Sequence, residues 1–109
     1  MKTLATKHDA EKIPLHLLPT EALLEVGKVL LHGQKKYNAW NWKKGMRWSR
    51  LYGASLRHLF AWAEGEVEDE ESHLSHLAHC ACCVLFLLVY EKLSLGIDDR
   101  WKYPQEEKK

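Results

Sequence analysis

Apolar residues recur with helical spacing in three stretches of this chain. The spacing predicts a first helix over residues 20–33, with Thr20 as its N-cap and Gly33 as its C-terminal stop. A second helix is predicted over residues 49–64, and a third over residues 72–96, with a serine at its cap and a glycine at its end. No stretch alternates apolar and polar residues as a half-buried strand does, so the pattern predicts an all-α fold.

The third predicted helix is apolar almost all round between residues 84 and 90. A helix of this kind belongs in the centre of a structure, but a chain of 109 residues has few helices with which to surround it. We therefore expect a single domain over residues 1–109, a compact helical bundle completed by oligomerisation as a homodimer or tetramer. Residues 97–109 are expected to form a loose tail from which only Trp101 docks.

The charge is small in total and uneven along the chain. A net charge of +1 argues against a nucleic-acid partner, because proteins that coat DNA or RNA usually carry a strong basic excess. Residues 35–50 are basic, whereas residues 64–71 are strongly acidic. A fold that joins these two segments would offer phosphate-binding and cation-binding groups at one site.

Three cysteines, Cys80, Cys82 and Cys83, lie within four residues. Neighbouring positions on a helix point apart and an odd count leaves one thiol unpaired, so a disulfide framework is not expected. The N-terminal residues contain no apolar run of signal-peptide length, and the apolar stretch over residues 80–90 is too short to span a bilayer. We expect a soluble cytoplasmic protein with no membrane partner.

The segment KKYNAWNWKKGMRW, residues 35–48, combines three tryptophans and a tyrosine with five positive charges. Aromatic faces accept flat rings and basic side chains accept phosphates, so the segment favours a nucleotide ligand. Trp42 is the residue expected to stack on a base, while Trp40 is expected to pack against a neighbouring helix. The alternative is a loop folded back on the core, with its tryptophans buried.

One narrow polar seam runs along the first predicted helix and contains Glu21, Glu25, Lys28 and His32. Apolar residues flank it, and carboxylates in such a seam are costly unless a cation such as Mg²⁺ neutralises them. The alternative is that Glu25 simply pairs with Lys28 at the i,i+3 spacing.

The third predicted helix carries histidines and thiols on one face, and one straight helix cannot wrap a tetrahedral zinc ion. Two of these histidines with carboxylates from elsewhere could bind a metal, or the histidines could bond phosphate oxygens. The alternative is a helix–helix interface with small thiols packed in it. The residues on this face are His73, His76, His79, Cys80 and Cys83.

The second predicted helix stacks Arg50 and Arg57 at the i,i+7 spacing, which suits a polyphosphate or bulk solvent. His58 and Trp62 share another face, as a core pair or as a wall for a base. The acidic turn that follows could supply metal ligands or could be simply solvated. The chain has no nucleophile elbow, no P-loop and no dinucleotide fingerprint, so metal-assisted attack of water on a phosphate is the chemistry that these residues allow.

The order of the segments LLPTEALLEVGKVL, NW, WSR, RHLFAW and HLAH, within residues 8–91, resembles the small phage family of dATP/dGTP diphosphohydrolases. That family is similar to the all-α MazG-like nucleoside triphosphate pyrophosphohydrolases. The resemblance implies an all-α oligomer that binds a purine nucleotide with a divalent metal and cuts it between the α and β phosphates. The Glu-Glu-x-x-Glu and Glu-x-x-Asp motifs of MazG-type enzymes are not literally present. The matching positions are Glu25, Lys36, Tyr37, Asn41, Trp42, Arg57, His58, Glu66, Asp69, Glu71, His76 and His79.

Together these observations predict a metal-dependent (deoxy)purine nucleoside triphosphate pyrophosphohydrolase that releases monophosphate and pyrophosphate. The alternative is a binding protein without turnover, which sequesters a nucleotide immune signal of the host. A phage-encoded chain would act in the cytoplasm of the infected bacterium. The expected catalytic residues are Glu25, Lys36 and Arg57. The expected nucleotide-binding residues are Lys36, Tyr37, Asn41, Trp42, Arg57, His58, Trp62, His76 and His79. The expected ligands of Mg²⁺ or Mn²⁺ are Glu21, Glu25, Glu66, Asp69 and Glu71.

Overall fold

The computed structural model describes residues 3–102 and 104, and these residues form helices joined by turns. The predicted all-α fold is confirmed, because the described residues contain isolated bridges but no strand. In chain order the elements are the 3₁₀ turn η1 (Leu15–Leu17), α1 (Thr20–Lys36), the 3₁₀ turn η2 (Asn41–Lys44), α2 (Trp48–Ala63) and α3 (His76–Leu93).

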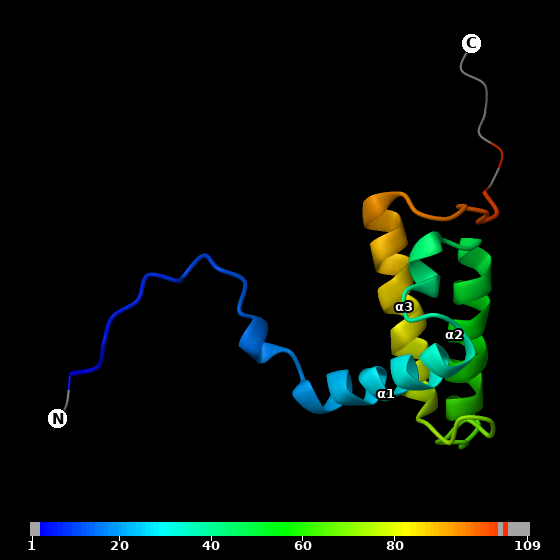
Figure 1. Cartoon of the computed structure of the whole chain (residues 1–109), viewed down its shortest axis with the longest axis horizontal. Coiled ribbons are helices and arrows are strands. Elements are labelled where there is room, and N and C mark those ends of the chain that lie inside the picture. Colours follow the sequence, from blue (N-terminus) through cyan, green and yellow to red (C-terminus); the bar gives the residue numbers. More distant parts are fainter. Residues whose placement is uncertain (1–2, 103, 105–109) are drawn as a thin grey trace, which may run out of the picture.

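Helices α2 and α3 lie side by side as an antiparallel hairpin, and α1 crosses them (Figure 1). From Val26 onward α1 packs on α3, whereas its first residues and the segment before it extend away from the hairpin. A small apolar core lies at the crossing, where Val26 and Val29 of α1 meet Ala78 and Cys82 of α3. This crossing brings the C-terminal end of α1 toward the turn that joins α2 to α3.

The predicted start and the predicted end of α1 were both wrong. Thr20 is the first helical residue rather than the cap, and Pro19 occupies the cap position without a side-chain hydrogen bond. The helix also runs one turn beyond Gly33, because this glycine has no positive φ and its carbonyl accepts the N–H of Tyr37. The extension places Lys36 on the helix.

The second predicted helix, residues 49–64, is confirmed to within one residue, but the start of the third was wrong. Ser75, not Ser72, is the N-cap of α3, and its side chain accepts the N–H groups of Leu77 and Ala78. His73 between them has a φ of 59°, a left-handed conformation that a helix cannot include. The helix ends at Leu93, before Ser94 with a φ of 55°, so Gly96 lies beyond its end.

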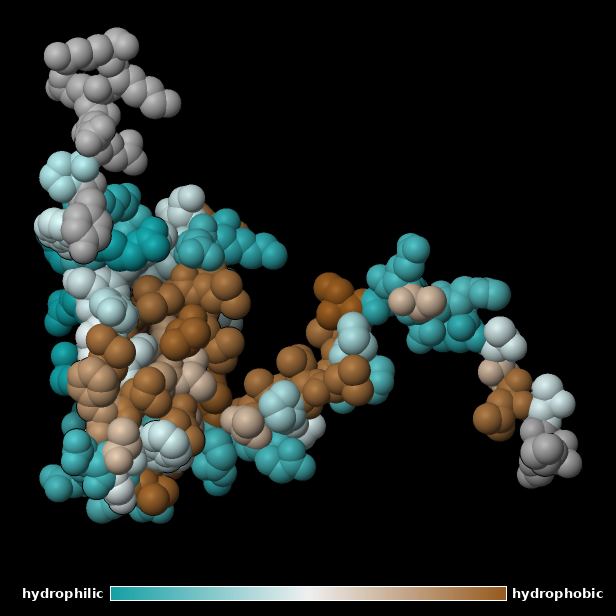
Figure 2. Space-filling view, turned by 180° about the vertical axis from the view of Figure 1, so that it is seen from behind, coloured by the Kyte–Doolittle hydropathy of each residue, from teal (hydrophilic) through white to brown (hydrophobic). Residues whose placement is uncertain are grey.

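Much apolar surface of the helices is exposed, as predicted from the all-round apolar character of α3. Val84 and Leu88 on α3 are 50% and 58% exposed, and Tyr52 on α2 is 58% exposed. Figure 2 shows apolar residues gathered over one face of the helical body and along the projecting α1. The described chain does not by itself cover this surface.

Helix α3 as a whole is longer than the apolar segment over residues 80–90. Among the described residues it is the one helix long and apolar enough to cross a bilayer, with a mean hydropathy of 1.5 over His76–Leu93. Central helices of bundles without a membrane share this length and composition.

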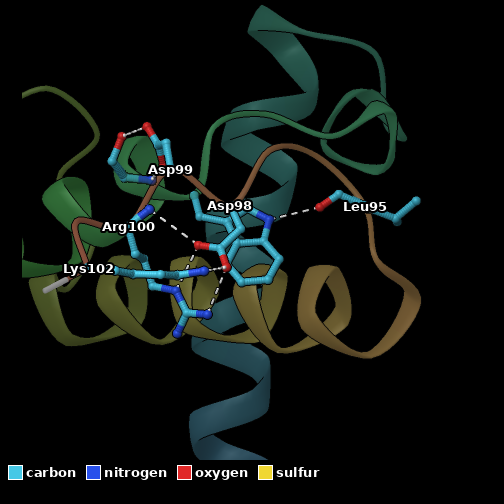
Figure 3. A network of polar contacts seen from close by, with 7 residues as sticks. Leu95, Asp98, Asp99, Arg100 and Lys102 are labelled. Carbon is cyan, nitrogen blue, oxygen red and sulfur yellow. Dashed lines mark hydrogen bonds and ion pairs between the residues drawn. The ribbon is translucent and has the colours of Figure 1, made fainter. Parts of the chain in front are cut away.

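The segment after α3 is held against the start of α2, contrary to the expected loose tail (Figure 3). The indole N–H of Trp48 donates to the carbonyl of Leu95, and the side chain and N–H of Ser49 donate to Asp99. Arg100 forms a two-pronged ion pair with Asp98 and lies over the Trp48 ring at 5.0 Å. Trp101 lines the hollow between α2 and α3 but is 72% exposed. The rest of the expected tail lies mostly outside the described residues.

Candidate functional site

Four histidines from three helices meet where α1 crosses α3. We call this group, which consists of His32, His58, His76 and His79, the histidine cluster. The rings of His58 and His79 stack at 4.5 Å with an angle of 7°. The Nδ1 atoms of His58 and His76 are 2.9 Å apart and share a hydrogen bond. His32 meets the ring of His79 edge-on at 6.5 Å.

The turn between α2 and α3 adds a carboxylate to this cluster. The N–H and the hydroxyl of Ser72 both donate to Oδ2 of Asp69, at 2.9 and 3.0 Å. The same hydroxyl shares a hydrogen bond of 2.7 Å with Nε2 of His79. Partial burial alone would raise the pKa of the Asp69 carboxyl, but the two bonds from Ser72 and the nearby imidazoles lower it below its usual value. Asp69 is therefore an anion at neutral pH.

His76 is the most enclosed member of the cluster, with 4% of its surface exposed. Its Nε2 lies 3.2 Å from Oε1 of Glu66, at an ion-pair distance but without the alignment of a hydrogen bond. Buried polar atoms without a hydrogen bond are uncommon, because their desolvation is not compensated. The position of this ring therefore calls for a functional explanation.

The environment keeps two of the imidazoles uncharged near neutral pH. Burial is the main cause that lowers the pKa of His58, and the adjacent His79 lowers it further. Burial likewise lowers the pKa of His79, despite the opposing effect of Asp69. Neutral imidazole is the form that binds metal ions. In the described part of the chain, His58, Asp69 and His76 each offer one ligand atom, and these atoms lie within 4.8 Å of one another.

An aromatic groove of about 380 Å³ opens beside the cluster, between α1, the loop over residues 37–46 and α3. Its floor includes Trp42, whose ring stacks on Phe86 of α3 at 4.4 Å with an angle of 8°. Cys82 also lines the groove, one helical turn from His79 of the cluster. The lining residues are Val29, Leu30, Gly33, Gln34, Tyr37, Asn38, Ala39, Asn41, Trp42, Met46, Arg50, Cys82 and Phe86.

The prediction that Trp40 packs against a neighbouring helix was wrong, because Trp42 takes that position. Trp40 is 65% exposed and contacts the ring of Trp42 and the ammonium of Lys43 rather than a helix. Trp42 is the ring that packs on α3, and its carbonyl accepts the hydroxyl proton of Tyr90. The reason is that the short η2 turn directs its second residue toward the core. Part of the loop is thus core, as the alternative interpretation held, while Trp42 still lines the groove.

The predicted basic and acidic segments do meet. Lys36, at the end of α1, forms an ion pair with Glu71 on the turn after α2. Of the expected metal ligands, Asp69 is at the histidine cluster and Glu66 borders it. This juxtaposition places Lys36 within reach of the cluster, although it is paired with Glu71 in this state.

The other two expected ligands, Glu21 and Glu25, lie elsewhere. Glu25 accepts a hydrogen bond of 2.8 Å from Lys28, and both side chains are about half exposed. Seven positions separate Glu25 from His32, the member of the histidine cluster on α1, which is roughly 10 Å along a helix. Glu21 lies one turn further from His32, so the structure does not bring either carboxylate to the histidine cluster.

Only some of the predicted nucleotide-binding residues line the aromatic groove. Tyr37, Asn41 and Trp42 line the aromatic groove. Arg57 and Trp62 are exposed on α2 and do not line it.

Sequence reasoning left four residues of the site unassigned. His32 was noted only as part of the seam on α1, and Ser72 was expected to be a cap. Arg50 was considered as suited to a polyphosphate or to bulk solvent but was left out of the expected binding residues, and Phe86 was not considered, yet both line the groove. The seven-residue spacing between His79 and Phe86 was the signal that the groove and the cluster share one side of α3.

These features define an all-α domain with a histidine and carboxylate centre beside an aromatic groove. The chain belongs to the family described as dATP/dGTP diphosphohydrolase, N-terminal, whose sequence profile matches residues 2–100. It is 33% identical over 96 residues to a dATP/dGTP diphosphohydrolase of Salmonella phage PMBT28. The match covers 87% of this chain and 33% of that protein, so the chain spans about a third of the relative's length. No solved structure matches the chain significantly. The predicted family resemblance is confirmed.

Proposed function

We propose that this chain binds a deoxypurine nucleoside triphosphate and, with a divalent metal ion, hydrolyses it to the monophosphate and pyrophosphate. Membership of the dATP/dGTP diphosphohydrolase family supports the class of substrate. The observation that carries the proposal is that the aromatic groove and the histidine cluster lie one turn apart on α3. The groove suits a base, and the cluster with its carboxylates suits phosphate chemistry.

The groove has the size and the lining of a small-molecule site. Its volume of about 380 Å³ lies within the range of roughly 300–1,000 Å³ typical of such sites. Tyr37 and Trp42 offer aromatic faces from the start and the middle of the loop, and the amides of Asn38 and Asn41 offer both donors and acceptors for a base edge. We assign the base to this groove and Arg50 at its border to the phosphates.

Cations are available where the phosphates would extend from the groove. Lys36 on α1 is held by Glu71, and a phosphate can replace that carboxylate as its partner. Arg57 precedes His58 on α2, and its exposed guanidinium is free to move toward a polyphosphate. Both side chains would neutralise negative charge that develops between the α and β phosphates.

The residues at the cluster fit a divalent ion, whereas the carboxylates of α1 do not reach it. His58, Asp69 and His76 supply three ligand atoms within 4.8 Å of one another. When bound, such an ion neutralises phosphate charge and makes a bound water more acidic. Asp69 and Glu66 supply the negative charge that balances it.

The test is incubation of the pure chain with a panel of deoxy- and ribonucleoside triphosphates and Mg²⁺ or Mn²⁺. Chromatography and phosphorus NMR should show a deoxypurine monophosphate and pyrophosphate, formed in equal amounts. Release of orthophosphate or of tripolyphosphate would place the cut at a different bond and contradict the proposal. Retention of an intact nucleotide without product would indicate sequestration rather than hydrolysis.

Lys36→Ala provides a second readout in the same assay. Its loss of affinity should be larger for a triphosphate than for the nucleoside and should shrink with added salt, because the lysine acts through charge. Lys44→Ala is the matched control, since Lys44 is an exposed lysine of the η2 turn that follows α1 and does not line the groove. Equal effects of the two substitutions would remove Lys36 from the phosphate site.

A further inference from the structure

The contact between His58 and His76 is unusual for two histidines that serve packing alone. They come from different helices, and their Nδ1 atoms face each other at 2.9 Å. Asp69 approaches the same point from the turn between the helices, so that one ligand atom from each residue lies within 4.8 Å of the others. Ser72 bonds to Oδ2 of Asp69, which leaves Oδ1 for another partner.

The second observation is the orphaned nitrogen of His76. This side chain is about 95% buried, and its Nε2 has no hydrogen-bond partner although the Glu66 carboxylate lies 3.2 Å away. A histidine that binds a metal through one nitrogen generally donates the N–H of the other to a carboxylate, a carbonyl or a water, and this bond orients the ring. Glu66 is in the position of that carboxylate, on the far side of the ring from His58.

We propose that His58 and His76, through their Nδ1 atoms, and the carboxylate of Asp69 form a binding site for a first-row transition-metal ion, with Glu66 as the residue that orients His76. Three protein ligands leave coordination positions open for water or a phosphate oxygen. Ligand nitrogens around a tetrahedral ion are roughly 3.3 Å apart, from metal–nitrogen distances of about 2.0–2.1 Å. The observed 2.9 Å therefore requires the two rings to separate slightly and to rotate, so that both Nδ1 lone pairs point at the ion and the proton between them is displaced.

The donor set decides the kind of ion. Imidazole nitrogens suit zinc, iron, cobalt and nickel, with manganese next, whereas Mg²⁺ prefers oxygen ligands and keeps much of its water. Two of the three donors here are imidazoles, so Mg²⁺ alone fits this site poorly. The carboxylates of Asp69 and Glu66 balance the two positive charges of the ion.

This inference does not require the nucleotide chemistry proposed above, because the site can be filled without any nucleotide. Co²⁺ is the first probe, since its visible absorption reports nitrogen ligation. The chain, freed of metal with a chelator, should give this absorption with one equivalent of Co²⁺, and Zn²⁺ should abolish it by displacement. Mg²⁺ in large excess should not compete.

Substitutions identify the ligands. His58→Asn and Asp69→Asn should each weaken Zn²⁺ binding in calorimetry by at least 100-fold. Glu66→Gln should weaken it by 10- to 100-fold, as is usual for residues that orient a ligand. The matched controls are His16→Asn, a histidine on η1 far from the cluster, and Glu70→Gln, an exposed carboxylate of the same turn. Circular dichroism of every variant checks that it is folded.

His58→Asn also separates the cluster from the thiols, because it retains Cys80, Cys82 and Cys83. Undiminished Co²⁺ or Zn²⁺ binding in this variant would move the ion to the cysteines or elsewhere and overturn the proposal. Failure of the native chain to bind either ion would show that His58 and His76 are only a hydrogen-bonded pair. If the chain then still hydrolyses nucleotides with Mg²⁺, the proposed function stands and the metal-site proposal fails. If the chain binds the metal but does not hydrolyse nucleotides, the metal-site proposal stands and the proposed function fails.

Discussion

The Nδ1 atom of His58 lies 2.9 Å from the Nδ1 atom of His76, although 18 positions separate these residues in the sequence. One ring must donate a proton to the other, so at least one nitrogen of the pair is unprotonated in the folded chain. Protonation of both rings would leave two N–H groups facing each other and would place two positive charges together in a partly buried setting. The pair therefore couples the stability of the helix crossing to pH and to metal ions.

The free energy of unfolding should fall as the pH drops below about 6.5, the unfolded-state pKa of histidine. Burial lowers the pKa of His58 and of His79 in the folded chain, so the unfolded chain binds more protons in this range and protonation favours unfolding. Urea denaturation between about pH 5 and 7.5, with a chelator present, measures this slope. In His79→Gln the free energy of unfolding should depend less steeply on pH. An unchanged dependence would contradict a contribution of His79 to this pH effect.

Gly96→Ala should destabilise the chain by about 2 kcal/mol or more. Gly96 has a φ of 73°, and a Cβ there would collide with the backbone of Met46, on which the segment after α3 rests. Gly27→Ala is the matched control, because Gly27 is helical with no atom near its would-be Cβ. That control should gain roughly 0.5–1 kcal/mol from helix propensity. An equal fall in melting temperature in both variants would contradict the role of the close approach between Gly96 and Met46.

Tyr37 and Trp42 should respond differently to truncation. Tyr37 is 61% exposed, so Tyr37→Ala should leave stability nearly unchanged and weaken nucleotide binding by ~1–3 kcal/mol through a lost base stack. Trp42 also stacks on Phe86, so Trp42→Ala should cost about 3 kcal/mol of stability in addition to affinity. Fluorescence titration and thermal unfolding measure the two quantities. If neither variant loses nucleotide affinity selectively, the base does not bind in the aromatic groove.

Self-association should be measurable by light scattering at micromolar concentration as a dimer or a larger species. The apolar residues Val84 and Leu88 are exposed beside Tyr52, and they line a hollow of about 690 Å³ between α2 and α3. Contiguous apolar surface of this kind usually marks an interface. Leu88→Glu should shift the mass toward the monomer, whereas Lys92→Glu, at an exposed position already charged, should not. A strictly monomeric native chain would contradict this prediction.

The sequence by itself determined the helical elements and the family. Helical spacing of apolar residues is a local property, so α2 could be located to within one residue and the all-α fold could be predicted without tertiary information. The ends of α1 and α3 were less certain, because a glycine fits inside a helix and either of two serines can cap one. The left-handed turn at His73, which holds Ser72 out of α3, decided between them.

The residues of the proposed metal centre were brought together only by the tertiary structure. His58, Asp69 and His76 lie on different elements, and no local spacing shows that a helix crossing and a tight turn place them within 4.8 Å. The seam on α1 had a regular pattern that suggested a metal site, yet Glu25 pairs with Lys28 and lies roughly two helical turns from His32 of the cluster. A ligand set depends on distances between side chains far apart in sequence, whereas periodicity reports only which residues share a face of one helix.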